Sequence, residues 1–157
     1  MYQFTIIHVG KLKTGPHQEL VDGYLKRLTP YAVVELVEVK EEKFTSVQNR
    51  TRVLAIEADK IASVIPNDAR PIVLDADGRE PNSTELATWI DTLCEQQTQH
   101  LAFIVGGPLG LADVVKQSAD KTFALSKQTY PHDLAIVMLT EQLYRSMTIL
   151  AGKTYHY

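Results

Sequence analysis

Two periodicities alternate along the chain, and the change from one to the other marks the expected elements. Continuous or alternating apolar runs, which are typical of β-strands, occur at 2–9, 33–39, 71–78, 101–105 and 122–126. Between them apolar residues recur every three to four positions, as they do in amphipathic helices. The expected helices are one that begins at Pro16, then 47–64, one capped by Ser83, a short one over 111–119 and a last one over 131–150.

Strands that alternate with helices predict an α/β fold: a single, mostly parallel sheet flanked by helices on both faces. The 157 residues have the length of one domain, and they contain no repeat and no low-complexity linker. We therefore expect residues 1–157 to form a single domain.

Composition and charge exclude several classes. Hydrophobic residues make up 45% of the chain and charged residues 22%, which is typical of a soluble globular protein. No apolar run approaches the roughly 20 residues of a membrane helix, and the first residues indicate a strand rather than a signal peptide. Because the single cysteine, Cys94, has no internal partner, we expect a cytoplasmic protein. The net charge of −3 argues against a free-standing nucleic-acid-binding domain, which is usually basic.

A glycine-rich turn, FIVGGPLGL (103–111), follows a buried strand and is the first candidate site. Its glycines do not have the dinucleotide-binding spacing, and Leu111 and Ala112 stand where a P-loop has lysine and a hydroxyl residue. The carboxyl end of a parallel strand is nevertheless where α/β sheets bind ligands. The turn is thus either a ligand-binding loop or a simple tight connection.

A second polar loop, ALSKQTYPHD (124–133), follows the last strand, where Pro131 keeps Tyr130 extended. With Leu74 and Asp75 ending a third strand, the loops are expected to form one crevice. Backbone donors and acceptors between apolar walls suit a flat heterocycle better than a polyphosphate. No histidine pairs with another histidine, a cysteine or a carboxylate at metal-ligand spacing, so no metal site is expected.

The last helix carries two apolar faces. One face contains Ile136, Leu139, Leu143, Met147 and Leu150, and the opposite face contains Leu134, Val137 and Met138 together with Glu141 and Arg145. A helix of this kind is buried on both sides, and one side is expected to be a subunit interface. The spacing of Glu141 and Arg145 allows an ion pair, which is either structural or part of a site.

Six segments occur in a recognisable order: VGKLK, VLDADG, FIVGGPLGL, ALSKQTYPH, LTEQLYRSM and GKTYHY. Together they resemble the bacterial ribosomal RNA large subunit methyltransferase H family, over nearly the whole chain. That family belongs to the SPOUT class. The resemblance implies methylation of N3 of a pseudouridine in 23S ribosomal RNA of the assembled ribosome, with S-adenosyl-L-methionine as cofactor. It also implies a homodimer whose C-terminal part forms a deep trefoil knot, an exception to the rule against knots.

The resemblance assigns roles to residues. It implies that the cofactor is held by Leu74, Gly106, Gly107, Gly110, Leu125, Ser126, Lys127, Gln128, Thr129 and Tyr130, with Gly106 and Gly107 letting backbone amides approach the adenosine. It implies that His132, Arg145, Tyr155 and His156 lie near the target base and that the tail completes the partner's site. Arg145 is the candidate for stabilising the N3 anion, and either His132 or His156 for accepting the proton. A sulfonium methyl donor requires neither a metal nor a covalent nucleophile.

Two positions depart from the family pattern. Ile136 stands where arginine usually completes a Pro-His-x-x-x-Arg motif, and Tyr157 stands where a basic residue usually follows Tyr-His. Both changes remove positive charge, although a local basic rim remains at Lys11, Lys13, Lys127, Arg145 and Lys153. Two alternatives therefore stay open: a non-catalytic ribosome- or RNA-binding protein on the same fold, and a SPOUT methyltransferase with another RNA target. A nicotinamide oxidoreductase is disfavoured because the glycine fingerprint is lacking.

Overall fold

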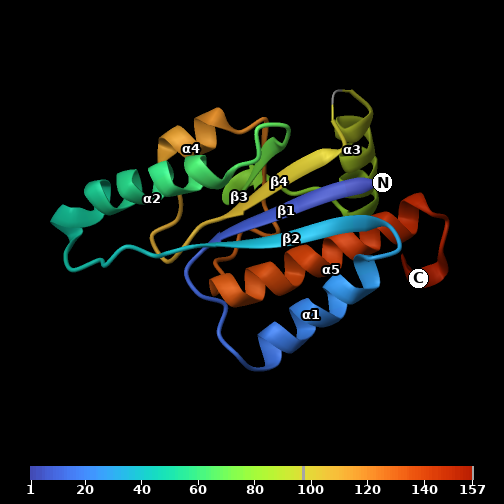
Figure 1. The fold of residues 1–157 in the computed structure, drawn as a ribbon, viewed down its shortest axis with the longest axis horizontal. Coiled ribbons are helices and arrows are strands. Elements are labelled where there is room, and N and C mark those ends of the chain that lie inside the picture. The colour runs from blue at the N-terminus through green and yellow to red at the C-terminus, as the bar shows by residue number, and fades with distance from the viewer. Residues whose placement is uncertain (97, 157) are drawn as a thin grey trace.

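The computed structural model describes residues 1–96 and 98–156. Its sheet has five parallel strands in the order β2-β1-β4-β3-β5 (Figure 1). The strands are β1 (Tyr2–Val9), β2 (Ala32–Val39), β3 (Arg70–Arg79), β4 (His100–Val105) and β5 (Lys121–Phe123). The helices are α1 (Pro16–Leu28), α2 (Arg50–Val64), α3 (Ser83–Gln96), α4 (Asp113–Ser118) and α5 (His132–Leu150), with 3₁₀ turns η1 (Val47–Asn49) and η2 (Thr154–His156). The predicted α/β class and parallel sheet are confirmed.

The sheet is covered on both faces, and β1 shows why. Phe4 and Ile6 point into a core shared with α1, α3 and α5, whereas Ile7 and Val9 point into a second core shared with α2 and α4. Successive side chains of a strand face opposite sides of a sheet, so a strand that is apolar at nearly every position must be buried on both. Figure 1 shows α2 and α4 on one side of the sheet and α1 and α5 on the other.

Helix α5 packs between α1 and α3, and none of its residues from His132 to Leu150 is exposed. The predicted apolar face is confirmed, since Ile136, Leu139 and Leu143 are completely buried. Val137 was assigned to the opposite face, but it belongs to the same core because flanking helices cover α5 on two sides.

The start of α3 corrects one predicted cap. Ser83 was expected to cap this helix, but the cap is Asn82, whose Oδ1 accepts a hydrogen bond of 2.8 Å from the Glu85 N–H. Glu85 in return accepts a bond of 3.1 Å from the Asn82 N–H, which completes a reciprocal capping arrangement. Ser83 Oγ instead donates to Gln142 of α5 at 2.8 Å and fastens the two helices together.

Strand β3 leaves its partner and then returns to it. Phe123 of β5 pairs with Leu74 and again with Arg79, and the Ala124 N–H donates to the Arg79 carbonyl at 2.8 Å. Residues 75–78 therefore form an excursion that passes close to the end of β5. This excursion and the segment after β5 lie at the carboxyl end of the sheet, where the candidate site is found.

Candidate active site

A cavity of about 290 Å³ lies at the carboxyl ends of β3 and β4 and beside the segment that follows β5. Every predicted cofactor residue except Lys127 lines it: Leu74, Gly106, Gly107, Gly110, Leu125, Ser126, Gln128, Thr129 and Tyr130. Three segments that are distant in sequence thus meet at one place, as expected from parallel strands that end at the same edge.

Lys127 has a different environment from its neighbours. Its Nζ donates hydrogen bonds of 3.0 Å to the carbonyl oxygens of both Ala76 and Gly78. Lys127 therefore connects the segment after β5 to the excursion of β3. It does not line the cavity, but it holds together two segments that do.

The glycines of the 103–111 turn are required by the turn itself. A Cβ atom on Gly106 would lie 2.9 Å from the backbone of Gly110, and one on Gly107 would lie 3.1 Å from Val9 of β1. Gly110 has a φ of 77°, in the left-handed region that favours glycine. Side chains added at Gly106 and Gly107 would point into the turn and into β1, so packing within the protein is by itself a reason for glycine at these two positions.

His132 lies at the edge of the cavity, among polar groups from two elements. Its Nε2 is 2.8 Å from Oδ1 of Asp133, a close polar contact without hydrogen-bond alignment, and 3.2 Å from the Lys11 carbonyl oxygen. The ring of His8 is stacked 6.5 Å away. Burial lowers the pKa of His8, and the nearby His132 lowers it further, although a hydrogen bond to the Gly10 carbonyl opposes both.

Arg145 and Tyr155 form a separate cluster at the other end of α5. The Arg145 guanidinium lies 2.5 Å from Glu141 Oε1 and stacks over the Tyr155 ring, with Cζ 4.9 Å from the ring centroid. Hydrogen bonding to Glu141 raises the pKa of Arg145, and burial with the neighbouring Tyr24 and Glu141 raises the pKa of Tyr155 to about 12. The predicted ion pair is therefore present. Thirteen residues at 1.5 Å each separate Arg145 from His132 by about 20 Å along the helix.

The remaining predicted residues are at the chain end. The backbone of His156 lies in η2, but its side chain and the whole of Tyr157 are outside the described residues. Among the residues that the structure describes, no cluster of three or more histidine, cysteine or acidic side chains is arranged to hold a metal ion. None of the described helices is long and apolar enough to cross a membrane.

A family model described as a predicted SPOUT methyltransferase matches residues 2–156. The chain belongs to the SPOUT methyltransferase family. It is 36% identical to the ribosomal RNA large subunit methyltransferase H of Syntrophomonas wolfei, over 98% of this chain and 99% of that one. It is 38% identical to the protein of the same name from Listeria welshimeri, over 96% of this chain and 97% of that one.

Among solved structures, a probable methylase family protein from Haemophilus influenzae is similar to this SPOUT methyltransferase in fold. The TM-score is 0.53 at 12% sequence identity, and the match covers 98% of this chain and 69% of that one. At this identity the likeness concerns the fold alone.

The sequence analysis of this SPOUT methyltransferase placed Asp75 in the crevice but missed Lys116, which also lines the cavity. Lys116 of α4 forms an ion pair of 2.6 Å there with Asp75, the first residue of the excursion of β3. Burial raises the pKa of Asp75, but hydrogen bonds from Lys116 and the Asp77 N–H outweigh it, and the pKa lies below its ordinary value. The position of Asp75 after a buried strand was visible in the sequence, whereas that of Lys116 depends on how α4 folds back.

Ile136 is one of the two departures from the family pattern. It is a residue of α5, and it is completely buried in the core shared by α1, α3 and α5. Isoleucine at this position packs against other apolar side chains, and no surface charge is missing there. The main argument for a non-catalytic relative is weakened accordingly.

Proposed function

We propose that this protein is an S-adenosyl-L-methionine-dependent methyltransferase of the cytoplasm that methylates N3 of a pseudouridine in 23S ribosomal RNA of the assembled ribosome. The observation that carries the proposal is the convergence of three strand-end segments on one cavity, which is lined by nearly all residues expected to hold the cofactor. Membership of the SPOUT methyltransferase family and the names of the relatives support it.

The residues of the cavity fit this cofactor in chemistry. Leu74, Leu111 and Leu125 offer apolar surface to a flat base, and Ser126 and Thr129 offer hydroxyl groups to a ribose or an amino acid moiety. When bound, S-adenosyl-L-methionine supplies a methyl group that is already activated on a sulfonium. The protein then has to orient the acceptor and to deal with its proton.

His132 is placed to accept that proton. It lies at the cavity edge, and the carboxylate of Asp133 lies 2.8 Å from its Nε2. Asp133 itself is buried, so its position beside the ring is fixed by packing. His156 remains the alternative base.

Arg145 is proposed to act on the cavity of the partner subunit of a homodimer. Within one chain it is about 20 Å from His132 along α5, too far for both side chains to reach one base. Glu141 and Tyr155 hold its guanidinium in a fixed, charged state, as stabilisation of a developing anion requires. Leu134 and Met138 on the outer face of α5 are half-buried, apolar and available for a subunit interface.

We also propose that the C-terminal segment forms the deep trefoil knot of this class. Four contacts support this arrangement: the pairing of Phe123 with both Leu74 and Arg79, and the two bonds of Lys127 across the excursion of β3. They bring the chain that enters α5 into close contact with residues 75–79.

The decisive experiment is incubation with radiolabelled S-adenosyl-L-methionine and either intact ribosomes or free ribosomal RNA, followed by mapping of the labelled nucleoside. We expect label at N3 of a pseudouridine in 23S ribosomal RNA, and only with ribosomes. Binding of the cofactor with no transfer to either substrate would leave a binding protein, and label at another nucleoside would indicate another RNA target.

A further inference from the structure

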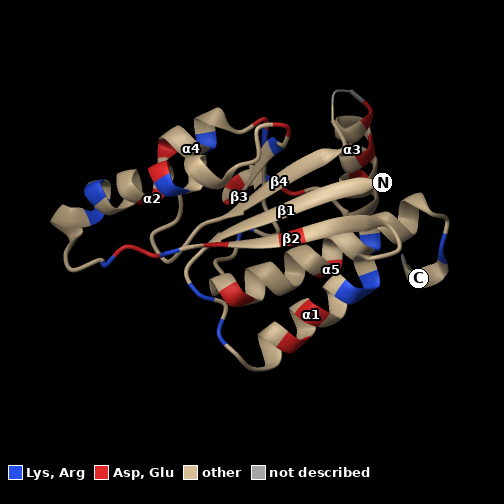
Figure 2. Ribbon diagram, viewed as in Figure 1, with Lys and Arg blue, Asp and Glu red and all other residues tan. Residues whose placement is uncertain are grey.

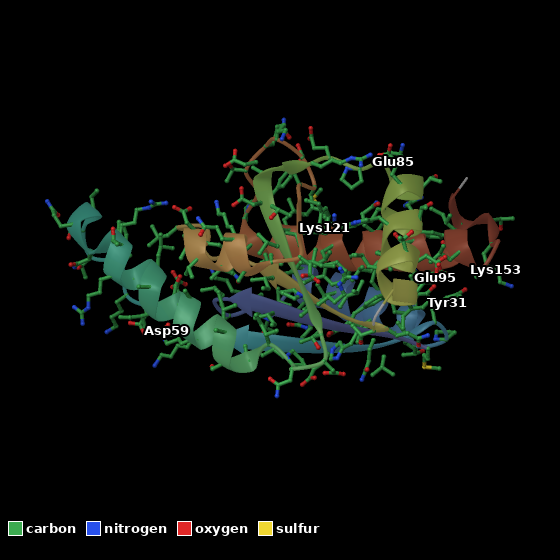
Figure 3. All side chains as sticks on the ribbon, turned by 90° about the horizontal axis from the view of Figure 1, so that it is seen from above. Tyr31, Asp59, Glu85, Glu95, Lys121 and Lys153 are labelled. Carbon is green, nitrogen blue, oxygen red and sulfur yellow. The ribbon has the colours of Figure 1, made fainter. Side chains whose placement is uncertain are left out.

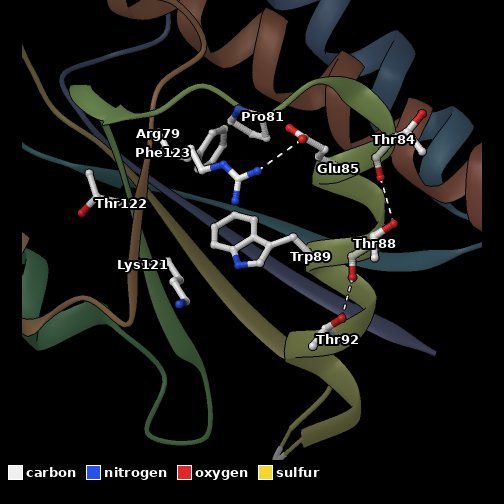
Figure 4. A pocket seen from close by; sticks show the side chains of 10 residues that line it. All are labelled: Arg79, Pro81, Thr84, Glu85, Thr88, Trp89, Thr92, Lys121, Thr122 and Phe123. Atoms are coloured by element: carbon white, nitrogen blue, oxygen red, sulfur yellow. Dashed lines mark hydrogen bonds and ion pairs between the residues drawn. The ribbon is translucent and has the colours of Figure 1, made fainter.

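A second, larger cavity of about 500 Å³ lies between α3 and the edge strand β5 (Figure 4). Its apolar floor is formed by Trp89 and Phe123, whose rings meet edge to face with their centroids 5.7 Å apart. Figure 4 shows the broad side of the Trp89 indole between the side chains of Arg79 and Lys121. An accessible aromatic face is the surface on which a nucleic acid base stacks.

Cations flank this aromatic face. Lys121 is exposed and forms no ion pair within the part of the chain that the structure describes. Lys121 of β5 and Glu85 of α3 line the same cavity, and both are labelled in Figure 3. Arg79 is paired with Glu85 at 3.2 Å, but its guanidinium is largely exposed and keeps further N–H groups for an anion. On α2, by contrast, basic and acidic side chains are interspersed in Figure 2.

The third wall is a row of hydroxyl groups on α3. Thr88 donates its hydroxyl hydrogen to the Thr84 carbonyl at 3.0 Å, and Thr92 donates to the Thr88 carbonyl at 2.8 Å. Because the hydrogens are engaged, these oxygens are left as acceptors toward the cavity. Amino groups of bases and ribose 2′-hydroxyls are donors that match them.

The position of the cavity relates it to the methyl-transfer site. Asp75, Ala76 and Asp77 line the cofactor cavity, and Arg79 and Pro81, a few residues later, line this one. From Asp77 to Pro81 the chain can span at most about 14 Å. Neighbouring nucleotides of one RNA strand can therefore reach both cavities across this segment.

We propose that the cleft between α3 and β5 binds an unpaired nucleotide of the ribosomal RNA substrate, close to the target nucleotide. The base stacks on Trp89, Lys121 and Arg79 contact phosphate, and the threonine oxygens accept hydrogen bonds from base or ribose. This inference rests on the proposed function, because it takes its ligand from the RNA substrate.

The first test uses Trp89 as its own reporter, since the chain contains one tryptophan. A single-stranded oligoribonucleotide of about ten nucleotides, carrying a fluorescent label, is titrated with the protein while both label anisotropy and tryptophan emission are followed. We expect saturable quenching of Trp89 with the same midpoint as the anisotropy change. Binding seen by anisotropy without quenching, or quenching by ribosomal proteins but not by RNA, would overturn the proposal.

The second test uses variants on intact ribosomes. Trp89→Leu removes the stacking surface and should raise KM for ribosomes about tenfold at unchanged kcat, since stacking contributes to ground-state and transition-state binding alike. Trp89→Phe keeps an aromatic face and the core contact with Phe123, and it should remain close to wild type. Lys121→Glu, at an exposed position that does not threaten folding, should raise KM and lower the salt dependence of binding by about one ion.

Arg52→Glu is the matched control, because Arg52 is an exposed cation of α2, on the opposite face of the sheet. It should leave KM unchanged. If ribosomes are methylated and Lys121→Glu behaves like Arg52→Glu, the cleft proposal is wrong while the proposed function stands. If no ribosome is methylated, the proposed function fails, and the quenching of Trp89 by RNA still decides about the cleft.

Discussion

Gly78 lies against the backbone of Phe123. A Cβ atom added at Gly78 would be 2.7 Å from the Cα and carbonyl carbon of Phe123 and 2.8 Å from its nitrogen. Backbone atoms, unlike the end of a flexible side chain, cannot move aside without shifting the strand. At this contact the excursion of β3 returns to β5, so the close packing of the two segments depends on the absence of a side chain at Gly78.

Gly78→Ala should therefore destabilise the protein by about 1–3 kcal/mol, the usual cost of overpacking. The matched control is Gly23→Ala, which lies within α1 with nothing within 4 Å of the added Cβ and should stabilise by roughly 1 kcal/mol. Urea denaturation followed by circular dichroism measures both. If Gly78→Ala is as stable as wild type, Gly78 and the Phe123 backbone are not in close contact in solution.

The cap of α3 gives a second prediction about stability. Asn82→Ala removes the acceptor of the Glu85 N–H and should lower the free energy of unfolding by about 1 kcal/mol. Asn82→Asp keeps a good capping oxygen and should cost little. The same denaturation measurement applies, and equal loss in both variants would mean that the side-chain oxygen does not cap the helix.

Most helices and strands could be predicted from the sequence, because the patterns that mark them are local. Strand and helix periodicities are local, so β1 and α5 could be located from their own residues. The convergence of Leu74, Gly106 and Ser126 also followed, because parallel strands share a carboxyl edge. The cap of α3 is also a local feature, but the sequence analysis placed it at Ser83, one residue after the actual cap, Asn82.

Tertiary details were beyond the sequence. The bonds of Lys127 to Ala76 and Gly78 depend on how two segments pack against each other, and no spacing within either segment encodes that packing. The contacts of Gly106 and Gly107 with Gly110 and Val9 likewise require the folded turn. The roles of the cavity residues toward cofactor and RNA stay predictions.

His8 should make stability depend on pH. Its pKa in the folded protein lies below the ordinary value of about 6.5, so between these two values the unfolded chain binds more protons. The free energy of unfolding should therefore fall as the pH is lowered from about 7 toward 5, by about 1.4 kcal/mol for each unit of pKa depression. Denaturation across this range should show a flatter profile for His8→Gln. An unchanged slope in His8→Gln would show that other groups control the pH dependence of stability. Glu57 is not one of them, because burial raises its pKa and its effect on stability has the opposite sign.

The separation of His132 and Arg145 on α5 leads to the sharpest prediction about the site. If each active site combines His132 of one subunit with Arg145 of the other, His132→Ala and Arg145→Ala should each abolish methyl transfer while cofactor binding persists in Arg145→Ala. Co-expressed, the two variants form mixed dimers in which one site lacks both residues and the other has both intact. With half of the dimers mixed, methyl transfer to ribosomes should return to about one quarter of the wild-type rate.

The control is a mixture of Arg145→Ala with the double variant carrying both changes, in which no dimer contains an Arg145 side chain. Its rate should stay at the background of the single variants, and isothermal titration calorimetry with S-adenosyl-L-methionine verifies that the cofactor cavity of Arg145→Ala is intact. Recovery in the first mixture alone places the two residues on different subunits of one site. If both mixtures remain at background although differently tagged subunits co-purify, then Arg145 serves the site of its own chain or only holds Glu141 and Tyr155 in place, and the shared site is wrong.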